Sequence, residues 1–201
     1  DGQGRRNIFW HRGNAVPDVT DLNETLLSSA VKVLHLDGLH LMPAITAAKI
    51  ARSLKVVTVL DAGTMRPGLE RLLPLIDHLV VSENFARQIF GRHDPQATLR
   101  FLAGYGAANV TITCCESGSV SIDNTGSVFQ QQAFEMDVVD TTGCGDVFHG
   151  GYIYGLLQGW EIQQTIRFAT ACAALKTRAL GGRTAIADLL AVKAFLRTRS
   201  D

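Results

Sequence analysis

Short apolar runs alternate with longer stretches of helical character through the first half of the chain. The runs are rich in β-branched side chains, as buried strands are, and they cover residues 31–36, 56–60, 78–81 and 110–113. The stretches between them carry helix start and stop signals such as Pro43 and Gly104, and they predict helices over residues 18–27, 43–54, 83–90 and 95–103. Strands that alternate with helices predict an α/β fold, with a mostly parallel sheet and helices on both of its faces.

The second half of the chain departs from this alternation. Residues 119–132 predict an antiparallel hairpin that turns about Asn124, Thr125 and Gly126. An alternating run over residues 134–139 predicts one more strand, and the remainder predicts helices over residues 147–157, 161–179 and 186–196. No repeat, linker or low-complexity segment divides the sequence, so we expect a single domain over residues 1–201.

Composition narrows the range of partners. Hydrophobic residues make up 46% of the 201 residues, which is enough for a large buried core. Lys plus Arg and Asp plus Glu number 19 each, without a basic block, so nothing favours nucleic acid or a membrane surface as a partner. The four cysteines form no C-x-x-C pair, which argues against zinc or a disulfide framework; they are Cys114, Cys115, Cys144 and Cys172. We therefore expect a cytoplasmic protein that binds small molecules.

Polar residues follow several predicted strands at the points where those strands end. They are Asp37-Gly38, Asp61-Ala62-Gly63, Ser82-Glu83-Asn84, Glu116-Ser117-Gly118 and Asp140-Thr141. A turn or a helix cap accounts for any one of them. Because ligands of open parallel sheets bind beyond the carboxyl ends of the strands, the whole series indicates a shared polar cleft.

The segment from Asp140 to Asp146, with the sequence Asp-Thr-Thr-Gly-Cys-Gly-Asp, is the strongest candidate for chemistry. It precedes a predicted helix whose first N–H groups lack intrahelical partners and whose dipole favours an anion. Gly143 and Gly145 would let a phosphate approach the backbone closely, and Asp146 could accept a hydroxyl proton. A glycine-rich turn with Asp146 as a solvated helix cap is the alternative interpretation. The second aspartate of the segment, Asp140, favours a functional role over a simple helix cap.

Other nucleotide-binding and hydrolytic signatures are missing from the sequence. There is no G-x-x-x-x-G-K-[ST] motif, and the glycines at residues 104 and 106 precede a strand, which is the wrong order for a dinucleotide fingerprint. There is also no G-x-S-x-G or H-E-x-x-H motif, so hydrolase and metalloprotease activities lack support.

The segment Asp140–Asp146 resembles the D-T-x-G-A-G-D signature of the ribokinase-like, or PfkB, carbohydrate kinases. Its flanks agree, because Phe148-His149-Gly150 stands in the place of Phe-Asn-Gly and residues 181–186 resemble the G-A-x-x-[AS]-[IV]-P closing segment of the family. The resemblance implies a ribokinase-like three-layer α/β/α fold. It also implies a kinase that transfers the γ-phosphoryl group of ATP to a sugar hydroxyl, with Mg²⁺ as cofactor.

The same resemblance implies a role for individual residues. Asp146 would be the catalytic base that deprotonates the acceptor hydroxyl, and Gly143, Cys144 and Gly145 would form the anion hole. Residues of two loops would bind the nucleotide; they are Thr113, Glu116, Ser117, Gly118, Gly181 and Gly182.

The sequence departs from the family pattern at the cation sites. Where the N-x-x-E motif of the family helps to place magnesium, this chain reads Ser82-Glu83-Asn84-Phe85, which leaves Glu83 and Asn84 as substitute metal ligands. Potassium-activated members use the positions of Asp140 and Thr142. Ala185 stands where they have a serine ligand, which argues against dependence on a monovalent cation.

Two cysteines also replace the usual residues of the family. Cys144 stands for alanine in the anion hole, where a backbone N–H is what is needed, so the change should be tolerated. Cys115 stands where glycine is common in the nucleotide loop, so we expect the fit around Glu116 and Ser117 to differ from that in the family.

The amino-terminal G-G-x-x-x-N segment, which binds the sugar in this family, is not among these residues. We therefore expect a chain truncated at its amino terminus, with residues 1–14 as a remnant of lid or edge strands. Residues 134–149 and 181–183 are most similar to kinases of fructose-type sugars, including ketohexokinase and sulfofructose kinase. The alternatives are a nucleotide- or sugar-binding module without catalysis, or a nucleoside or vitamin kinase of the same fold, and a homodimer is left open.

Overall fold

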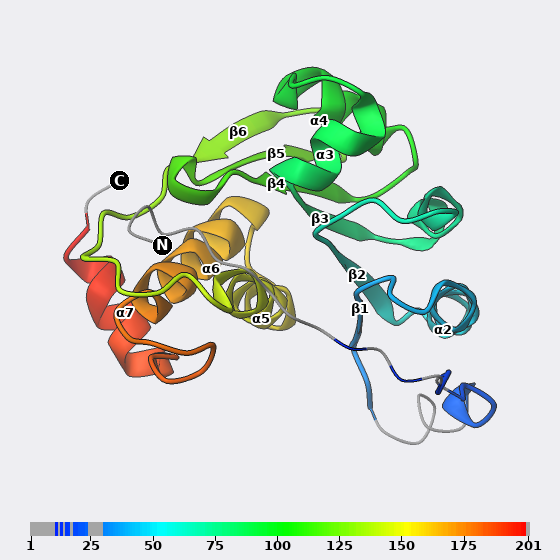
Figure 1. Cartoon of the computed structure of the whole chain (residues 1–201), viewed down its shortest axis with the longest axis horizontal. Coiled ribbons are helices and arrows are strands. Elements are labelled where there is room, and N and C mark those ends of the chain that lie inside the picture. Colours follow the sequence, from blue (N-terminus) through cyan, green and yellow to red (C-terminus); the bar gives the residue numbers. More distant parts are fainter. Residues whose placement is uncertain (1–10, 12, 14, 17, 24–29, 200–201) are drawn as a thin grey trace. The chain divides into compact units, whose positions relative to one another are not determined.

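The chain forms two compact units in the computed structural model shown in Figure 1. The structure describes residues 11, 13, 15–16, 18–23 and 30–199. We call residues 15–130 the sheet unit and the described part of residues 131–201 the helical unit. The single domain expected over residues 1–201 stays a prediction. The predicted remnant at residues 1–14 lies outside the described residues apart from His11 and Gly13, and so does most of the helix predicted over residues 18–27.

The sheet unit is built on six strands that follow one another in chain order across the sheet (Figure 1). They are β1 (Val33–Leu36), β2 (Val57–Ala62), β3 (His78–Ser82), β4 (Asn109–Thr113), β5 (Ser119–Asp123) and β6 (Val128–Gln131). Strands β1 to β4 are parallel, and β5 pairs with β4 in the antiparallel direction. The predicted hairpin is confirmed, with Gly126 at φ +84° in its turn. The four predicted strands are confirmed as well, with ends shifted by one or two residues, but only β2, β3 and β4 are mostly buried; β1 is half-buried, and its His35 is exposed.

Three helices cover one face of this sheet: α2 (Leu41–Ser53), α3 (Glu83–Phe90) and α4 (Pro95–Ala103). They share a core with side chains that alternate along β2, β3 and β4, such as Leu60, Leu79 and Ile112. The predicted bounds of α3 and α4 are confirmed because clear local signals mark both ends. Each has an N-cap side chain that accepts a backbone N–H, from Ser82 and Asp94 respectively, and each ends at a glycine.

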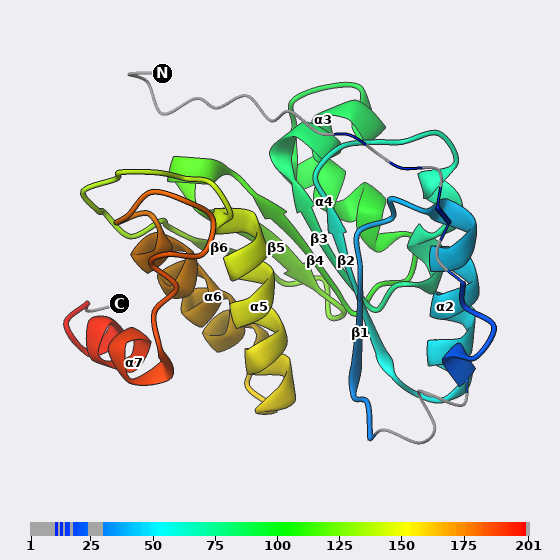
Figure 2. The same cartoon turned by 60° about the horizontal axis from the view of Figure 1, so that its bottom comes forward.

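The helical unit contains α5 (Cys144–Leu157), α6 (Ile162–Lys176) and α7 (Leu189–Arg197). Helices α5 and α6 lie side by side in both Figure 1 and Figure 2. Glycine permits this close packing, because a Cβ at Gly155 would lie 2.7 Å from Thr165 Oγ1 and one at Gly151 would lie 2.9 Å from Ala169 Cα. All three helices differ from their predicted bounds: α5 begins three residues earlier, α6 ends three earlier and α7 starts three later, after Asp188 as its N-cap.

The strand predicted over residues 134–139 is wrong, since these residues join no sheet. Their alternation is real, because Phe134 and Met136 pack against the core of the helical unit. These two side chains pack against helices and not against another strand. The apolar end of the run is exposed, with Val138 at 55% and Val139 at 57%. Alternation of apolar and polar residues therefore indicates that one face of a segment is buried, but not whether a strand or a helix covers it.

None of the helices in the described part of the chain is both long and apolar enough to cross a membrane.

Candidate functional site

The glycine turn lies in the helical unit, at the start of α5. Gly143 is the N-cap residue and has φ +79°, a conformation that L side chains rarely adopt. A Cβ at this position would lie 2.6 Å from the carbonyl oxygen of Gly182. The turn therefore packs directly against the segment that follows α6, which is the second glycine segment singled out by the sequence.

The N-terminus of α5 presents unpaired donors. The N–H of Cys144 donates to the carbonyl oxygen of Thr141 at 3.2 Å, so one of the three predicted anion-hole donors is already engaged. Across residues 30–199, the N–H groups of Gly145 and Asp146 meet no acceptor, and both residues are exposed. A Cβ at Gly145 would meet nothing within 4 Å, so an anion has open access to these two groups.

Asp146 stands in the first turn of α5 beside these donors. Its side chain is exposed, and it makes no hydrogen bond or ion pair with the residues that the structure describes. In contrast, His149 is buried, and its Nδ1 lies 2.8 Å from the carbonyl oxygen of Gly145. The carboxylate of Asp146 is thus available to a ligand, whereas His149 supports the first turn of the helix.

Asp140 connects the two glycine segments through its carboxylate. Oδ1 accepts the N–H of Thr142 at 2.8 Å, and Oδ2 accepts the N–H of Gly181 at 2.7 Å. The backbone hydrogen bond from Thr142, then the Thr142 side chain and the Gly181 N–H, lower the pKa of Asp140 to about 2. Asp140 is therefore ionised at neutral pH and holds both turns in place.

Lys176 is a member of this cluster that the sequence reasoning missed. It is the last residue of α6 and is fully buried. Its Nζ donates to the carbonyl oxygen of Asp140 at 2.8 Å and lies 4.0 Å from Asp140 Oδ2. The sequence did contain a signal, because Lys176 ends a helix of small and apolar residues directly before the second glycine segment. A lysine is rarely buried in such surroundings unless it has a partner.

The predicted nucleotide residues of the sheet unit lie at the end of β4. Thr113 Oγ1 donates to the carbonyl oxygen of Val81 at 3.3 Å, and Glu116 and Ser117 are exposed in the short 3-10 helix η3 (Cys115–Ser117). The loop closes at Gly118, which has φ +85°. Cys115 itself has φ +51°, which explains why glycine suits this position.

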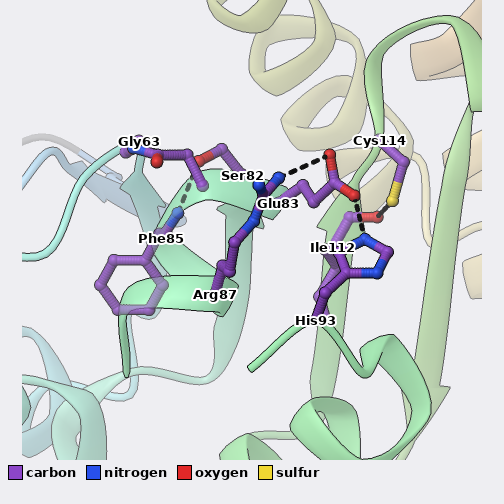
Figure 3. A network of polar contacts seen from close by, with 9 residues as sticks. Gly63, Ser82, Glu83, Phe85, Arg87, His93, Ile112 and Cys114 are labelled. Atoms are coloured by element: carbon purple, nitrogen blue, oxygen red, sulfur yellow. Dashed lines mark hydrogen bonds and ion pairs between the residues drawn. The ribbon is translucent and has the colours of Figure 1, made fainter. Parts of the chain in front are cut away.

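The substitute metal ligands are the first two residues of α3, and Figure 3 shows Glu83 with its partners. Glu83 contacts the His93 ring nitrogen Nε2 at 2.5 Å and the Arg87 guanidinium at 3.5 Å. The amide nitrogen of Asn84 lies 3.4 Å from both the carbonyl oxygen of Gly63 and the hydroxyl of Thr64. Both predicted ligands therefore already have protein partners.

Ser82 and Phe85, the two residues that depart from the metal motif of the family, have structural roles near Glu83. Ser82 donates to the carbonyl oxygen of Gly63 at 2.8 Å and accepts the N–H of Phe85, while Phe85 is fully buried in the core. Next to them, burial first and then the Glu83 carboxylate raise the pKa of the Cys114 thiol to about 11. That thiol is therefore protonated and unreactive at neutral pH.

The predicted site residues thus fall into local groups. The structure brings together Asp140, Thr142, Gly143, Cys144, Gly145, Asp146, Gly181 and Gly182 within the helical unit. Thr113, Glu116, Ser117 and Gly118 form one loop of the sheet unit, and Glu83 and Asn84 form another.

A mostly parallel sheet with an antiparallel hairpin at its edge, followed by a glycine turn that opens a helix, defines a ribokinase-like α/β protein. Comparison with known proteins agrees with this class. Residues 1–188 match the pfkB family carbohydrate kinases, and the chain belongs to this family.

The chain is also similar in sequence to curated proteins and in fold to solved structures. An ATP-dependent 6-phosphofructokinase of Thermoanaerobacterium thermosaccharolyticum is 29% identical over 128 residues, which are 64% of this chain and 39% of that protein. Arabidopsis thaliana ribokinase, solved with ribose and ATP, is similar with a TM-score of 0.77 and 24% identity over 89% of this chain and 59% of that one. A double mutant of fructokinase from Vibrio cholerae O395, solved with fructose, ADP and a potassium ion, gives a TM-score of 0.75 and 21% identity over 83% and 60%.

These likenesses confirm the ribokinase-like fold class expected from the sequence. The chain spans about two fifths of the length of the curated relative and about three fifths of the two solved proteins.

Proposed function

We propose that the intact protein transfers the γ-phosphoryl group of ATP to a hydroxyl group of a small sugar, and that the start of α5 is the catalytic centre. One observation carries this proposal: among the described residues, the exposed Asp146 carboxylate has no partner, and it stands beside two backbone N–H groups that also lack one. A base and an anion-binding site in the same helical turn are what phosphoryl transfer requires. Membership of the carbohydrate kinase family supports the same chemistry.

The proposed roles of these groups follow from their charges. The N–H groups of Gly145 and Asp146 would bind the oxygens of the transferring phosphoryl group, where negative charge is concentrated. The Asp146 carboxylate would accept the proton of the sugar hydroxyl as its oxygen attacks phosphorus. Cys144 contributes through backbone position, because its N–H donates to Thr141 and its Sγ lies 3.7 Å from the Ala173 carbonyl oxygen.

The cations are a separate question. Bound with ATP, Mg²⁺ would neutralise phosphate charge. Glu83 and Asn84 offer the oxygen ligands that Mg²⁺ prefers, but the Glu83 carboxylate is held by His93 and Arg87. This geometry does not fit direct coordination by Glu83, so we assign it no metal bond. The nucleotide-binding roles of Thr113, Glu116, Ser117, Gly118, Gly181 and Gly182 rest on the resemblance and remain predictions.

A binding module without catalysis is the second candidate. It is favoured by the metal motif, since Ser82 serves as a helix cap and Phe85 as a core residue where the family has metal-placing side chains. The two candidates differ in one measurable property: only a kinase releases ADP in proportion to the sugar supplied.

The deciding experiment is a sugar-dependent ADP-release assay on the intact protein, screened first with fructose-type ketoses and then with nucleosides. We expect Asp146→Asn to lower kcat by at least about 10²-fold, the lower end of what a general base contributes, with little change in the Kd for ATP. Asp137→Asn is the matched control, because Asp137 is an exposed aspartate of the same unit outside the turn. Undiminished turnover by Asp146→Asn would refute the catalytic assignment, and a failure to release ADP with any acceptor, by a protein that still binds ATP, would favour the binding module.

A further inference from the structure

Lys176 is unusual among the charged residues because its side chain is fully buried. A buried ammonium group needs compensating charge and hydrogen bonds to be tolerated. Among the described residues, its single ion-pair partner is Asp140, with Nζ 4.0 Å from Oδ2 and 2.8 Å from the carbonyl oxygen of the same residue. The lysine is thus dedicated to the Asp140 turn.

Two oxygen atoms of Asp140 lie near the Lys176 ammonium group, and both are of the type that binds alkali cations. A carbonyl oxygen and a carboxylate oxygen are hard oxygen donors, and a potassium ion and an ammonium group carry the same charge at similar size. The resemblance of the sequence places a monovalent cation at Asp140 and Thr142, and Ala185 removes a further oxygen ligand from that site. The residues therefore do not fit a dissociable cation, because a cation that belongs to the chain already contacts Asp140.

We propose that the Lys176 ammonium group is a built-in cation that takes the place of a bound monovalent ion and positions the 140–146 turn. Lys176 is a positioning residue: it holds Asp140, and the Asp140 carboxylate accepts the N–H groups of Thr142 and Gly181, one from each glycine segment. The backbone supports the same arrangement, since the N–H groups of Val139 and Asp140 donate to the carbonyl oxygen of Thr177, the next residue after the lysine.

This inference rests on the proposed function only for its effect on turnover, since the cation effect on folding can be measured without any activity. The wild-type intact protein should therefore show the same melting temperature and kcat/KM in potassium, sodium and tetramethylammonium chloride of equal ionic strength. An enzyme without a cation site has no reason to distinguish these ions.

Removing the ammonium group should create a dependence on potassium. Lys176→Ala leaves the carboxylate and carbonyl oxygens of Asp140 around an open space, so we expect kcat/KM in tetramethylammonium to fall about tenfold to 100-fold, as for the loss of a charge-assisted hydrogen bond. Potassium should restore much of this loss and raise the melting temperature by about 3 °C or more, whereas tetramethylammonium should do neither. Lys176→Met, which keeps the bulk of the side chain, should lose the same activity without rescue.

Lys193→Ala is the matched control, because Lys193 is an exposed lysine of the same unit. The proposal is overturned if potassium selectively activates or stabilises the wild-type protein, or if Lys176→Ala folds and shows no preference among the three salts. If Lys176→Ala does not fold, a potassium-selective rise in the melting temperature or kcat/KM of the wild type still overturns the proposal. An intact protein that releases no ADP with any sugar would overturn the proposed kinase activity, while the melting temperatures would still decide the cation question.

Discussion

Gly143 and Gly182 approach so closely that a methyl group on Gly143 would lie 2.6 Å from the Gly182 carbonyl oxygen. Two glycine segments that are far apart in the sequence are thereby in direct backbone contact. The contact restricts which substitutions Gly143 can accept, whereas a Cβ at Gly145 would meet nothing within 4 Å.

Gly143→Ala should destabilise the protein. Alanine must adopt φ +79° and also displace the backbone at Gly182, and strain of this kind typically amounts to about 1–3 kcal/mol in the free energy of unfolding. Urea denaturation of the intact protein measures the change. A stability equal to that of the wild type would show that the two segments separate easily.

Gly145→Ala should have the opposite profile. Its Cβ would project into open space, and alanine is favoured over glycine in a helix by up to about 1 kcal/mol, so stability should be unchanged or slightly raised. The methyl group would nevertheless stand in the path of an anion that approaches the N–H groups of Gly145 and Asp146. We therefore expect a lower kcat/KM for ATP at normal stability, and unchanged kinetics would argue against an anion site at this turn.

Asp140→Asn should remove a pH-dependent part of the stability. The pKa of Asp140 in the folded protein is about 2, below its usual value of 3.8, so the ionised carboxylate stabilises the fold above about pH 4, and this contribution is lost as the pH falls toward 2. The difference in unfolding free energy between wild type and variant should be constant from about pH 5 to 7 and should shrink below about pH 4. A difference that does not change with pH would contradict the assigned hydrogen bonds.

Cys115→Gly should stabilise the loop after β4. A residue other than glycine at φ +51° is strained by roughly 1 kcal/mol, and glycine relieves that strain. Cys115→Ala keeps the strain and serves as the control, so only the glycine variant should raise the midpoint of denaturation. Equal midpoints for the two variants would mean that the loop relaxes without the substitution.

Much of the sheet unit could be predicted because its signals are local. Helices α3 and α4 carry their caps and stop residues in their own sequence, and β-branched runs identify β2 to β4. The run over residues 134–139 has the same kind of signal but is covered by helices, and no local pattern reports which element covers a buried face.

The chemistry of the site was predictable only in part, for a similar reason. Asp140 and Asp146 could be chosen because they flank a glycine turn, a relationship within seven residues. The contacts of Lys176 with Asp140 and of Glu83 with His93 depend on how the chain folds back on itself. The sequence alone therefore predicted no role for the lysine, and it predicted that Glu83 is a metal ligand. Whether a charged side chain is buried can be judged only when the position of its partner is known.

The tight glycine contacts between α5 and α6 have a mechanical consequence. With Gly151 against Ala169 and Gly155 against Thr165, the two helices approach closely, and Tyr154 of α5 stacks on Phe168 of α6 beside these contacts. We expect the start of α5 and the end of α6, joined again through Asp140 and Lys176, to move together. In the kinase activity proposed above, a closing motion would then pivot outside residues 140–182, and the proposed anion site would move together with Asp140 and Lys176.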